Sequence, residues 1–75
     1  MKNNESASAA ADTQRIERVA RMAECIFESK NIALSWMWRE NIALGNAKPI
    51  GLCDTDEGAA QVRRVLSAIE HGNPV

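Results

Sequence analysis

The chain has 75 residues, which is enough for one small domain and close to the lower limit for a self-sufficient hydrophobic core. Hydrophobic residues make up 45% of it and aromatic residues only 4%, a composition that favours packed helices over sheets. The formal net charge of −1 argues against nucleic acid as the main partner, and no apolar run approaches the roughly 20 residues of a membrane span.

The N-terminal third predicts one helix preceded by a disordered leader. Residues 1–11 are small and polar and offer no secretory signal, so we expect a disordered leader and a cytoplasmic protein. A helix is expected to begin at Asp12 or Thr13. Its apolar positions span an arc of about 160°, which is wider than a stripe that faces one neighbour. They are Ile16, Val19, Ala20, Met22, Ala23, Ile26 and Phe27. We therefore expect two packing neighbours, one of which another chain could supply.

Residues 31–39 predict a short helix that is apolar on nearly every side. Trp36 and Trp38 point about 200° apart on an α-helix, so they cannot both fill one core. We expect one indole to pack within the chain and the other to meet a partner, with Trp38 and Met37 as candidate interface residues. The alternative is that a single subunit buries both indoles.

The tetrapeptide Asn-Ile-Ala-Leu occurs twice, at 31–34 and 41–44. The first copy belongs to the predicted second helix. The second copy is followed by Gly45 and Asn46, which tolerate positive φ, and then by Pro49, so a helix cannot continue through it. We expect a turn in which Leu44 packs into the core, and then a short helical turn from Pro49 to Cys53.

The last helix has clear signals at both ends. Asp54 is the expected N-cap, with Glu57 at capping-box spacing, and Gly72 is the expected stop. The apolar set spans about 120°, a normal one-sided stripe. It consists of Ala59, Val62, Val65, Leu66 and Ile69. Arg63 and Arg64 lie outside this stripe, where they are solvated or contact an acidic partner. The predicted fold is an all-α bundle of three to four helices that forms a dimer.

The sequence offers no arrangement typical of an enzyme, a metal site or a cofactor site. Cys25 and Cys53 are far apart and form no C-x-x-C pattern, so we expect reduced thiols that act as small hydrophobic residues. His71 has no nucleophile at a catalytic spacing and can complement the negative end of the last helix. We expect a binding protein without catalytic activity.

From about residue 30 onward, an ordered series of residues resembles a known module. The series is Trp36, Asn41, Ala43, Leu44, Gly45, Pro49, Leu52 and Gly58, followed by Ile69, Glu70, His71 and Gly72. It is similar to the toxin-binding domain of Xre/MbcA/ParS-type antitoxins. The resemblance implies that residues 12–75 form a helical toxin-binding domain whose motif and core include these residues.

The resemblance further implies a homodimer whose cognate partner is a RES-type toxin, an enzyme that breaks down NAD. In the family the C-terminal end of the antitoxin lies at the mouth of the toxin's active site. The corresponding residues here are Glu70, His71, Gly72, Asn73, Pro74 and Val75. Many members also carry an N-terminal helix-turn-helix, whereas one helix precedes the similar region here, so we do not expect this chain to bind DNA by itself.

Two alternatives stay open. The first is a homodimeric structural or adaptor module without a toxin, in which the apolar second helix serves self-association. The second is a DNA-binding regulator, which the charge balance disfavours. The oligomeric state bears on the first alternative, and a salt-sensitive gel shift would support the second.

Overall fold

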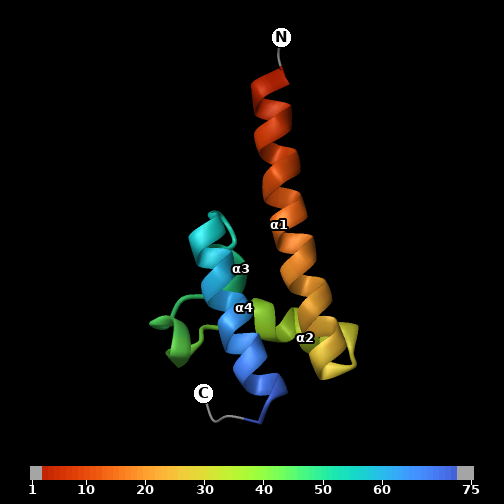
Figure 1. Cartoon of the computed structure of the whole chain (residues 1–75), viewed down its shortest axis with the longest axis vertical. Coiled ribbons are helices and arrows are strands. Elements are labelled where there is room, and N and C mark those ends of the chain that lie inside the picture. Colours follow the sequence, from red (N-terminus) through yellow and green to blue (C-terminus); the bar gives the residue numbers. More distant parts are fainter. Residues whose placement is uncertain (1–2, 73–75) are drawn as a thin grey trace.

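The computed structural model describes residues 3–72, with side chains from residue 11 onward. This part of the chain forms four α-helices and one short 3-10 helix (Figure 1). In chain order they are α1 (Asn3–Phe27), α2 (Lys30–Met37), η1 (Ile42–Leu44), α3 (Pro49–Leu52) and α4 (Asp56–Glu70). The described residues contain no strand, and the one isolated β-bridge joins Asn41 to Ala47. The prediction of a small all-α bundle is confirmed.

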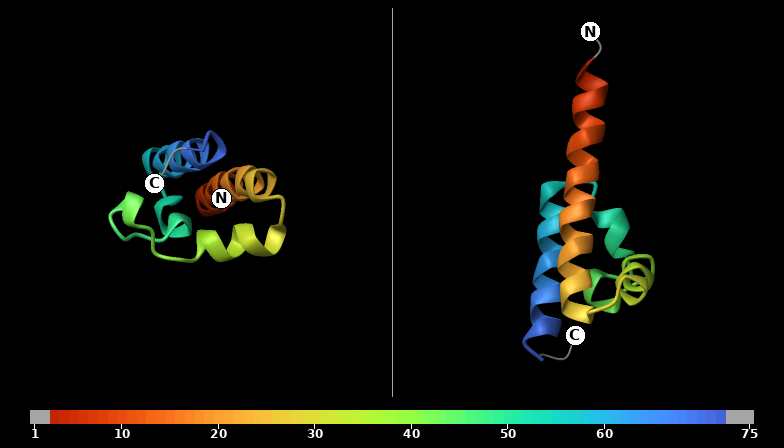
Figure 2. Two further views of the ribbon diagram at one scale, coloured as in Figure 1. Left: turned by 90° about the horizontal axis from the view of Figure 1, so that it is seen from below. Right: turned by 90° about the vertical axis from the view of Figure 1, so that its right-hand side faces the viewer.

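Helix α1 is longer than the sequence predicts. It begins at Asn3 and not near Asp12 or Thr13, so the backbone of residues 3–11, expected to be disordered, is helical. The Ala-rich composition of this stretch explains the difference, because Ala has the highest helix propensity and the packed part of α1 supplies the nucleus. In Figure 2 the N-terminal half of α1 extends beyond the other helices. The helix ends where Glu28 adopts a left-handed conformation with φ 55°.

Helix α1 packs against both α2 and α4 of its own chain. The two neighbours that its wide apolar arc predicts are therefore both present within one subunit, and no second chain is needed to supply either. The core draws side chains from α1, α2, α4 and the turn before α4. They are Val19, Ala23, Ala33, Met37, Cys53, Ala59, Val62 and Leu66. Removing these apolar side chains from water is the main stabilising contribution to the fold.

The second Asn-Ile-Ala-Leu copy forms a hydrogen-bonded turn. The Asn41 side chain accepts a hydrogen bond from the Ala43 N–H at 2.9 Å and thereby begins η1. Gly45 and Asn46 follow with φ 66° and 69°, in the left-handed region that the sequence predicts. Leu44 packs against the core, as predicted.

Helix α4 is capped one residue later than the sequence predicts. Pro49 opens α3 as expected. At the next helix, however, the Thr55 hydroxyl and not the Asp54 carboxylate accepts the hydrogen bond from the Gly58 N–H, at 2.9 Å. Thr55 has the extended backbone typical of an N-cap, with φ −127° and ψ 160°. The helix start is therefore in the predicted region but is held by a different side chain.

Helices α3 and α4 approach so closely that glycine is required at their contact. A Cβ atom on Gly58 would lie 1.9 Å from the backbone oxygen of Leu52, far inside van der Waals contact. Gly51, within α3, has open space around the same position. Gly58 therefore serves close backbone packing, and Gly51 does not.

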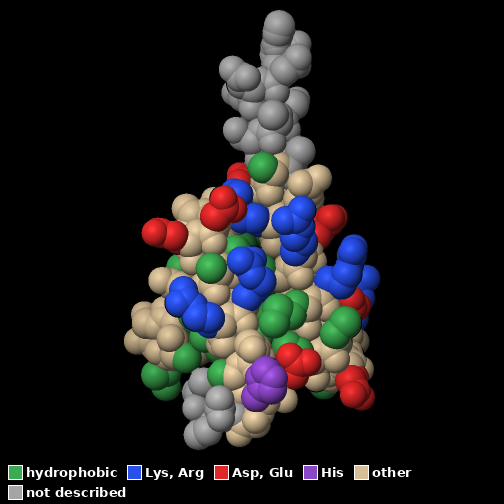
Figure 3. Space-filling view, viewed as in Figure 1, with side chains coloured by type: hydrophobic (Ala, Val, Ile, Leu, Met, Phe, Trp, Pro, Cys, Tyr) green, Lys and Arg blue, Asp and Glu red, His purple; other side chains and the backbone are tan. Residues whose placement is uncertain are grey.

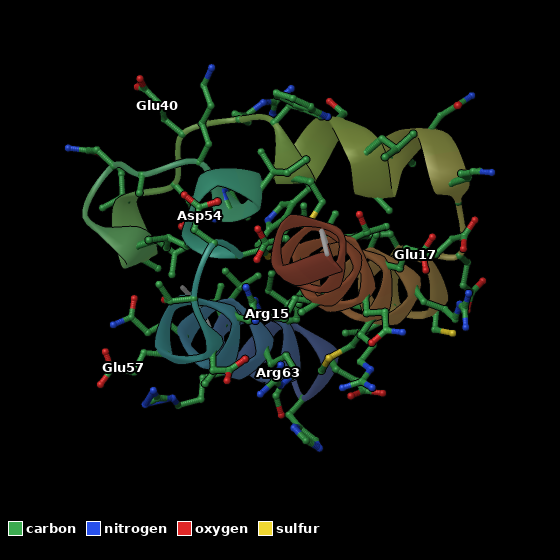
Figure 4. All side chains as sticks on the ribbon, turned by 90° about the horizontal axis from the view of Figure 1, so that it is seen from above. Arg15, Glu17, Glu40, Asp54, Glu57 and Arg63 are labelled. Atoms are coloured by element: carbon green, nitrogen blue, oxygen red, sulfur yellow. The ribbon has the colours of Figure 1, made fainter. Side chains whose placement is uncertain are left out.

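Arg15 on α1 ties this corner of the fold together, a role that the sequence analysis does not predict. Its guanidinium donates to the main-chain oxygens of Cys53 and Asp54, at 3.0 and 2.8 Å. It also forms ion pairs with the carboxylates of Asp12 and Asp56. Figure 4 shows Arg15 between α1 and α4. These hydrogen bonds satisfy carbonyl groups that are left free where α3 ends.

Candidate functional site

The C-terminal end of α4 is exposed and has a defined cap. Glu70, His71 and Gly72 are all exposed. The His71 ring donates from Nδ1 to the Ser67 carbonyl at 2.9 Å, and Gly72 has φ 80°, so the predicted stop at Gly72 is confirmed. The other three residues of the predicted partner-binding segment, Asn73, Pro74 and Val75, lie outside the described residues.

The two tryptophans have different surroundings, as their positions predict. Trp36 is half-buried and packs on Phe27, with ring centroids 5.9 Å apart and ring planes tilted by 46°. Trp38 caps the end of α2 and leaves 57% of its surface exposed. Met37 lies between them and is only 1% exposed. The prediction that Met37 contributes to an interface is therefore wrong, because its side of α2 faces the core.

A groove between α1 and α2 opens beside the exposed side of α2. Its lining residues are Glu17, Ala20, Arg21, Glu24, Lys30, Ala33 and Leu34. Leu34 is 42% exposed and stands one helical turn before Trp38, so the two side chains are neighbours on the helix surface. This surface combines exposed apolar groups with charges of both signs, which is the usual make-up of a contact between proteins.

A second groove lies between η1 and α4. It is lined by Ala43, Leu44, Gln61, Arg64 and Val65. These residues include one cation and no carboxylate. Ile42, the first residue of η1, is 88% exposed. The turn therefore presents one aliphatic side chain to solvent while Leu44 packs inward.

Arg63 and Arg64 are both exposed, but they face different surroundings. Arg64 lines the groove beside η1, whereas the charge of Arg63 acts on the thiol of Cys53. Figure 4 shows Arg63 on the side of α4 away from η1. In Figure 3, Lys and Arg side chains gather across the middle of the face that α1 and α4 form. The sequence presents the two arginines as a pair, and the structure separates them.

The residues that carry the family resemblance shape the fold around these surfaces. Three of them, Trp36, Leu44 and Leu52, pack against the core, and Pro49 is buried. Asn41 and Gly45 form the two ends of η1, Ala43 lines the second groove, and Gly58 allows close helix contact. Exposed Ile42 lies among them and is missed by the sequence analysis. The sequence does contain an indication of its exposure. Side chains two positions apart in a 3-10 turn point in different directions, so a turn that directs Leu44 into the core directs Ile42 away from it.

The described residues show no metal-binding cluster, since no group of three or more His, Cys, Asp and Glu side chains comes together in them. Both cysteines are free thiols. Cys53 is buried, and burial, reinforced by the charge of Asp54, raises the pKa of its thiol. It is therefore kept in the less reactive protonated form. Cys25 is exposed, which corrects the expectation that it acts as a packed hydrophobic residue. Among the described helices, none has the length and apolarity to cross a membrane.

Known proteins resemble the chain over most of its length. Residues 22–72 match a family model described as the antitoxin Xre/MbcA/ParS C-terminal toxin-binding domain. The chain is also 34% identical over 67 residues to a protein named Antitoxin Xre from Photorhabdus laumondii subsp. laumondii. That match covers 84% of this chain and 45% of the relative, so the chain spans less than half the length of the protein it resembles. No solved structure matches the chain.

Proposed function

Because the chain belongs to the Xre/MbcA/ParS antitoxin family, we propose that it is an antitoxin that binds and neutralises a RES-type, NAD-degrading toxin. The observation that carries the proposal is the match of residues 22–72 to a toxin-binding domain, a range that runs from within α1 to the end of α4. The likeness to a protein named Antitoxin Xre supports it. The exposed apolar groups on α2 and η1 are suited to binding another protein.

In this proposal the C-terminal segment, residues 70–75, acts at the mouth of the toxin's active site. The described part of the segment is exposed, which supports the assignment. The backbone N–H groups of His71 and Gly72 bond to the last turn of α4, to Ser67 and Ile69. A partner can therefore cover this end of the helix without displacing core residues.

Co-expression with the RES-type toxin gene that we expect beside the chain's own gene tests the proposal. We expect the full chain to restore growth that the toxin alone arrests. A chain that lacks residues 70–75 should still bind the toxin but should no longer protect the cells. Normal protection by the shortened chain would contradict the role of the segment, and failure of the full chain to protect would contradict the proposed function.

The proposal includes a homodimer that pairs through the α1–α2 groove and Trp38. Leu34 and Trp38 offer an apolar centre, and the groove carries Glu17 and Glu24 as well as Arg21 and Lys30. Charges of both signs allow one surface to pair with its own copy about a two-fold axis. The same exposed surface also favours the second candidate function, a homodimeric adaptor that has no toxin partner.

Light scattering of the purified chain tests the dimer. Trp38 neighbours the groove-lining Leu34 on the surface of α2, so Trp38→Ala should shift the dimer toward monomer. Ile32→Ala, at another exposed position outside the groove lining, should not. A wild-type chain that is monomeric at micromolar concentration would contradict the dimer and the adaptor alike. A stable dimer that neutralises no toxin would favour the adaptor.

A further inference from the structure

We propose that the toxin docks over η1 and the groove between η1 and α4, where it covers exposed Ile42, places an apolar side chain against Leu44 and Val65 in the groove, and sets a carboxylate beside Arg64. This inference rests on the proposed function and adds the surface and the chemistry of recognition. The expected partner surface has one apolar side chain that enters the groove and an Asp or Glu next to it.

The turn that exposes Ile42 has a fixed conformation. Asn41 accepts a hydrogen bond from Ala43, and its backbone forms a bridge to Ala47, with Asn41 N to Ala47 O at 3.1 Å. The Gly45 N–H closes the turn on the Ile42 carbonyl at 3.0 Å. Ile42 is 88% exposed although these three hydrogen bonds order the backbone of the turn that carries it. A preorganised apolar side chain of this kind loses little conformational entropy on binding.

The lining of the groove suits an apolar side chain with a carboxylate beside it. Ala43, Leu44 and Val65 make its lining apolar, and Gln61 and Arg64 add polar groups from α4. A guanidinium beside an apolar surface matches a carboxylate of a partner, because Arg binds carboxylates through two parallel hydrogen bonds. Arg64 also lies outside the hydrogen bonds and ion pairs that hold the described fold together. It is therefore available to a partner.

The groove and the C-terminal segment lie within reach of one partner. Arg64 and His71 are separated by about two helical turns, so they lie on the same side of α4. Figures 1 and 2 both place η1 and the end of α4 in the half of the molecule away from the N-terminus. One partner can thus fill the groove and cover Glu70–Gly72 with a continuous surface.

Charge distinguishes the toxin from a second copy of the chain as the occupant. If two copies paired through this groove about a two-fold axis, Arg64 of one copy would face the groove of the other. That groove is lined by Arg64 as a cation and by no carboxylate. Such a pairing would bury like charges, which is unfavourable. The α1–α2 groove is lined by both acidic and basic side chains, so two copies can pair through it without burying only like charges.

The chain contains a matched control for each residue in the test. Arg63 neighbours Arg64 on α4, is also exposed, and lies on the side away from η1 (Figure 4). Ile32 stands at the same place in the first Asn-Ile-Ala-Leu copy as Ile42 in the second, and it is 56% exposed. All four side chains are exposed, so substitutions should leave the unfolding temperature nearly unchanged.

Calorimetry measures the affinity of the full chain for a purified RES-type toxin, the partner that the proposed function assigns to it. Arg64→Glu and Ile42→Ser should each weaken binding by about 10- to 100-fold, and Arg63→Glu and Ile32→Ser by less than about threefold. If the wild-type chain binds the toxin and Arg64→Glu and Ile42→Ser bind it equally well, the docking surface is wrong and the proposed function stands. The same would follow if these two variants lost dimerisation and kept toxin affinity. If the wild-type chain does not bind, the proposed function fails and the docking surface with it.

Discussion

Gly51 and Gly58 lie only a few residues apart, and their surroundings predict opposite effects of the same substitution. Gly58→Ala places a Cβ atom 1.9 Å from the Leu52 backbone oxygen, so α3 and α4 must separate. We expect the free energy of unfolding to fall by about 2–3 kcal/mol, a large part of the total for a domain of this size. Gly51→Ala meets no atom within 4 Å and should raise it by about 0.5–1 kcal/mol.

Urea unfolding of the two variants beside the wild-type chain checks this prediction. Equal midpoints for both variants would mean that the close approach of α4 to α3 does not exist in solution. A destabilised Gly51→Ala variant would mean instead that α3 is not helical at that position.

Thr55 and Asp54 offer a second test at the residue level. Thr55→Ala removes the side chain that accepts the Gly58 N–H and should cost about 1 kcal/mol of stability. Asp54→Ala should lower stability less. The main-chain oxygen of residue 54 accepts a hydrogen bond from Arg15, and this oxygen is kept in the variant. Thermal unfolding of both variants measures the two losses of stability. A larger loss for Asp54→Ala than for Thr55→Ala would indicate that Asp54 is the N-cap.

The limits of sequence reasoning at this level have a physical cause. The stretch 54–57 holds four side chains able to accept a hydrogen bond at a helix start, and only the φ and ψ angles select Thr55 among them. Arg15 illustrates the same limit over a longer distance. Its acceptors on Cys53 and Asp54 are far away in sequence, so no local pattern reveals them.

Among the elements, sequence and structure agree best where Gly or Pro forces a change of conformation. The end of α4 near Gly72, the opening of α3 at Pro49 and the turn at Gly45 are predicted correctly. The start of α1 is predicted wrongly, because an Ala-rich stretch has no large apolar side chain and yet favours helix once a neighbouring turn is formed.

The repeated tetrapeptide shows why local sequence alone does not decide conformation. Its first copy lies within α2, and its second copy begins with an Asn cap and forms η1. The flanking residues make the difference, since Ser29 caps α2 ahead of the first copy, while Gly45 and Asn46 follow the second with positive φ. Within η1, Leu44 packs inward and leaves Ile42 exposed, which the sequence analysis does not predict.

Substitutions of the adjacent residues Met37 and Trp38 distinguish the effect of helix α2 on folding from its effect on association. Met37→Ala removes a side chain that is 1% exposed and should lower the free energy of unfolding by about 2–5 kcal/mol. Trp38→Ala removes one that is 57% exposed, so it should change folding much less and weaken the proposed dimer. Denaturant unfolding at several protein concentrations measures both effects, and a larger loss of monomer stability in Trp38→Ala would contradict the assignment.

Considered as a whole, the molecule has two grooves on different sides of its core, one proposed for a second copy of the chain and one for the toxin. Figure 4 shows Glu17, which lines the α1–α2 groove, on the opposite side of the molecule from η1. A dimer through the first groove therefore leaves the η1–α4 groove open to a toxin. The sequence predicts excess apolar surface on the second helix, but not the η1–α4 groove, because that groove joins residues from two segments whose contact depends on the complete fold.

We propose that this small bundle inhibits a toxin by covering it. The most direct measurement uses the proposed partner, a purified RES-type toxin, and follows the rate at which it consumes NAD while the full chain is titrated in. We expect the rate to fall toward zero near stoichiometric amounts, to fall equally with Arg63→Glu, and to stay high with Arg64→Glu at the same concentrations. NAD consumption that is unaffected by an excess of the wild-type chain would contradict the account.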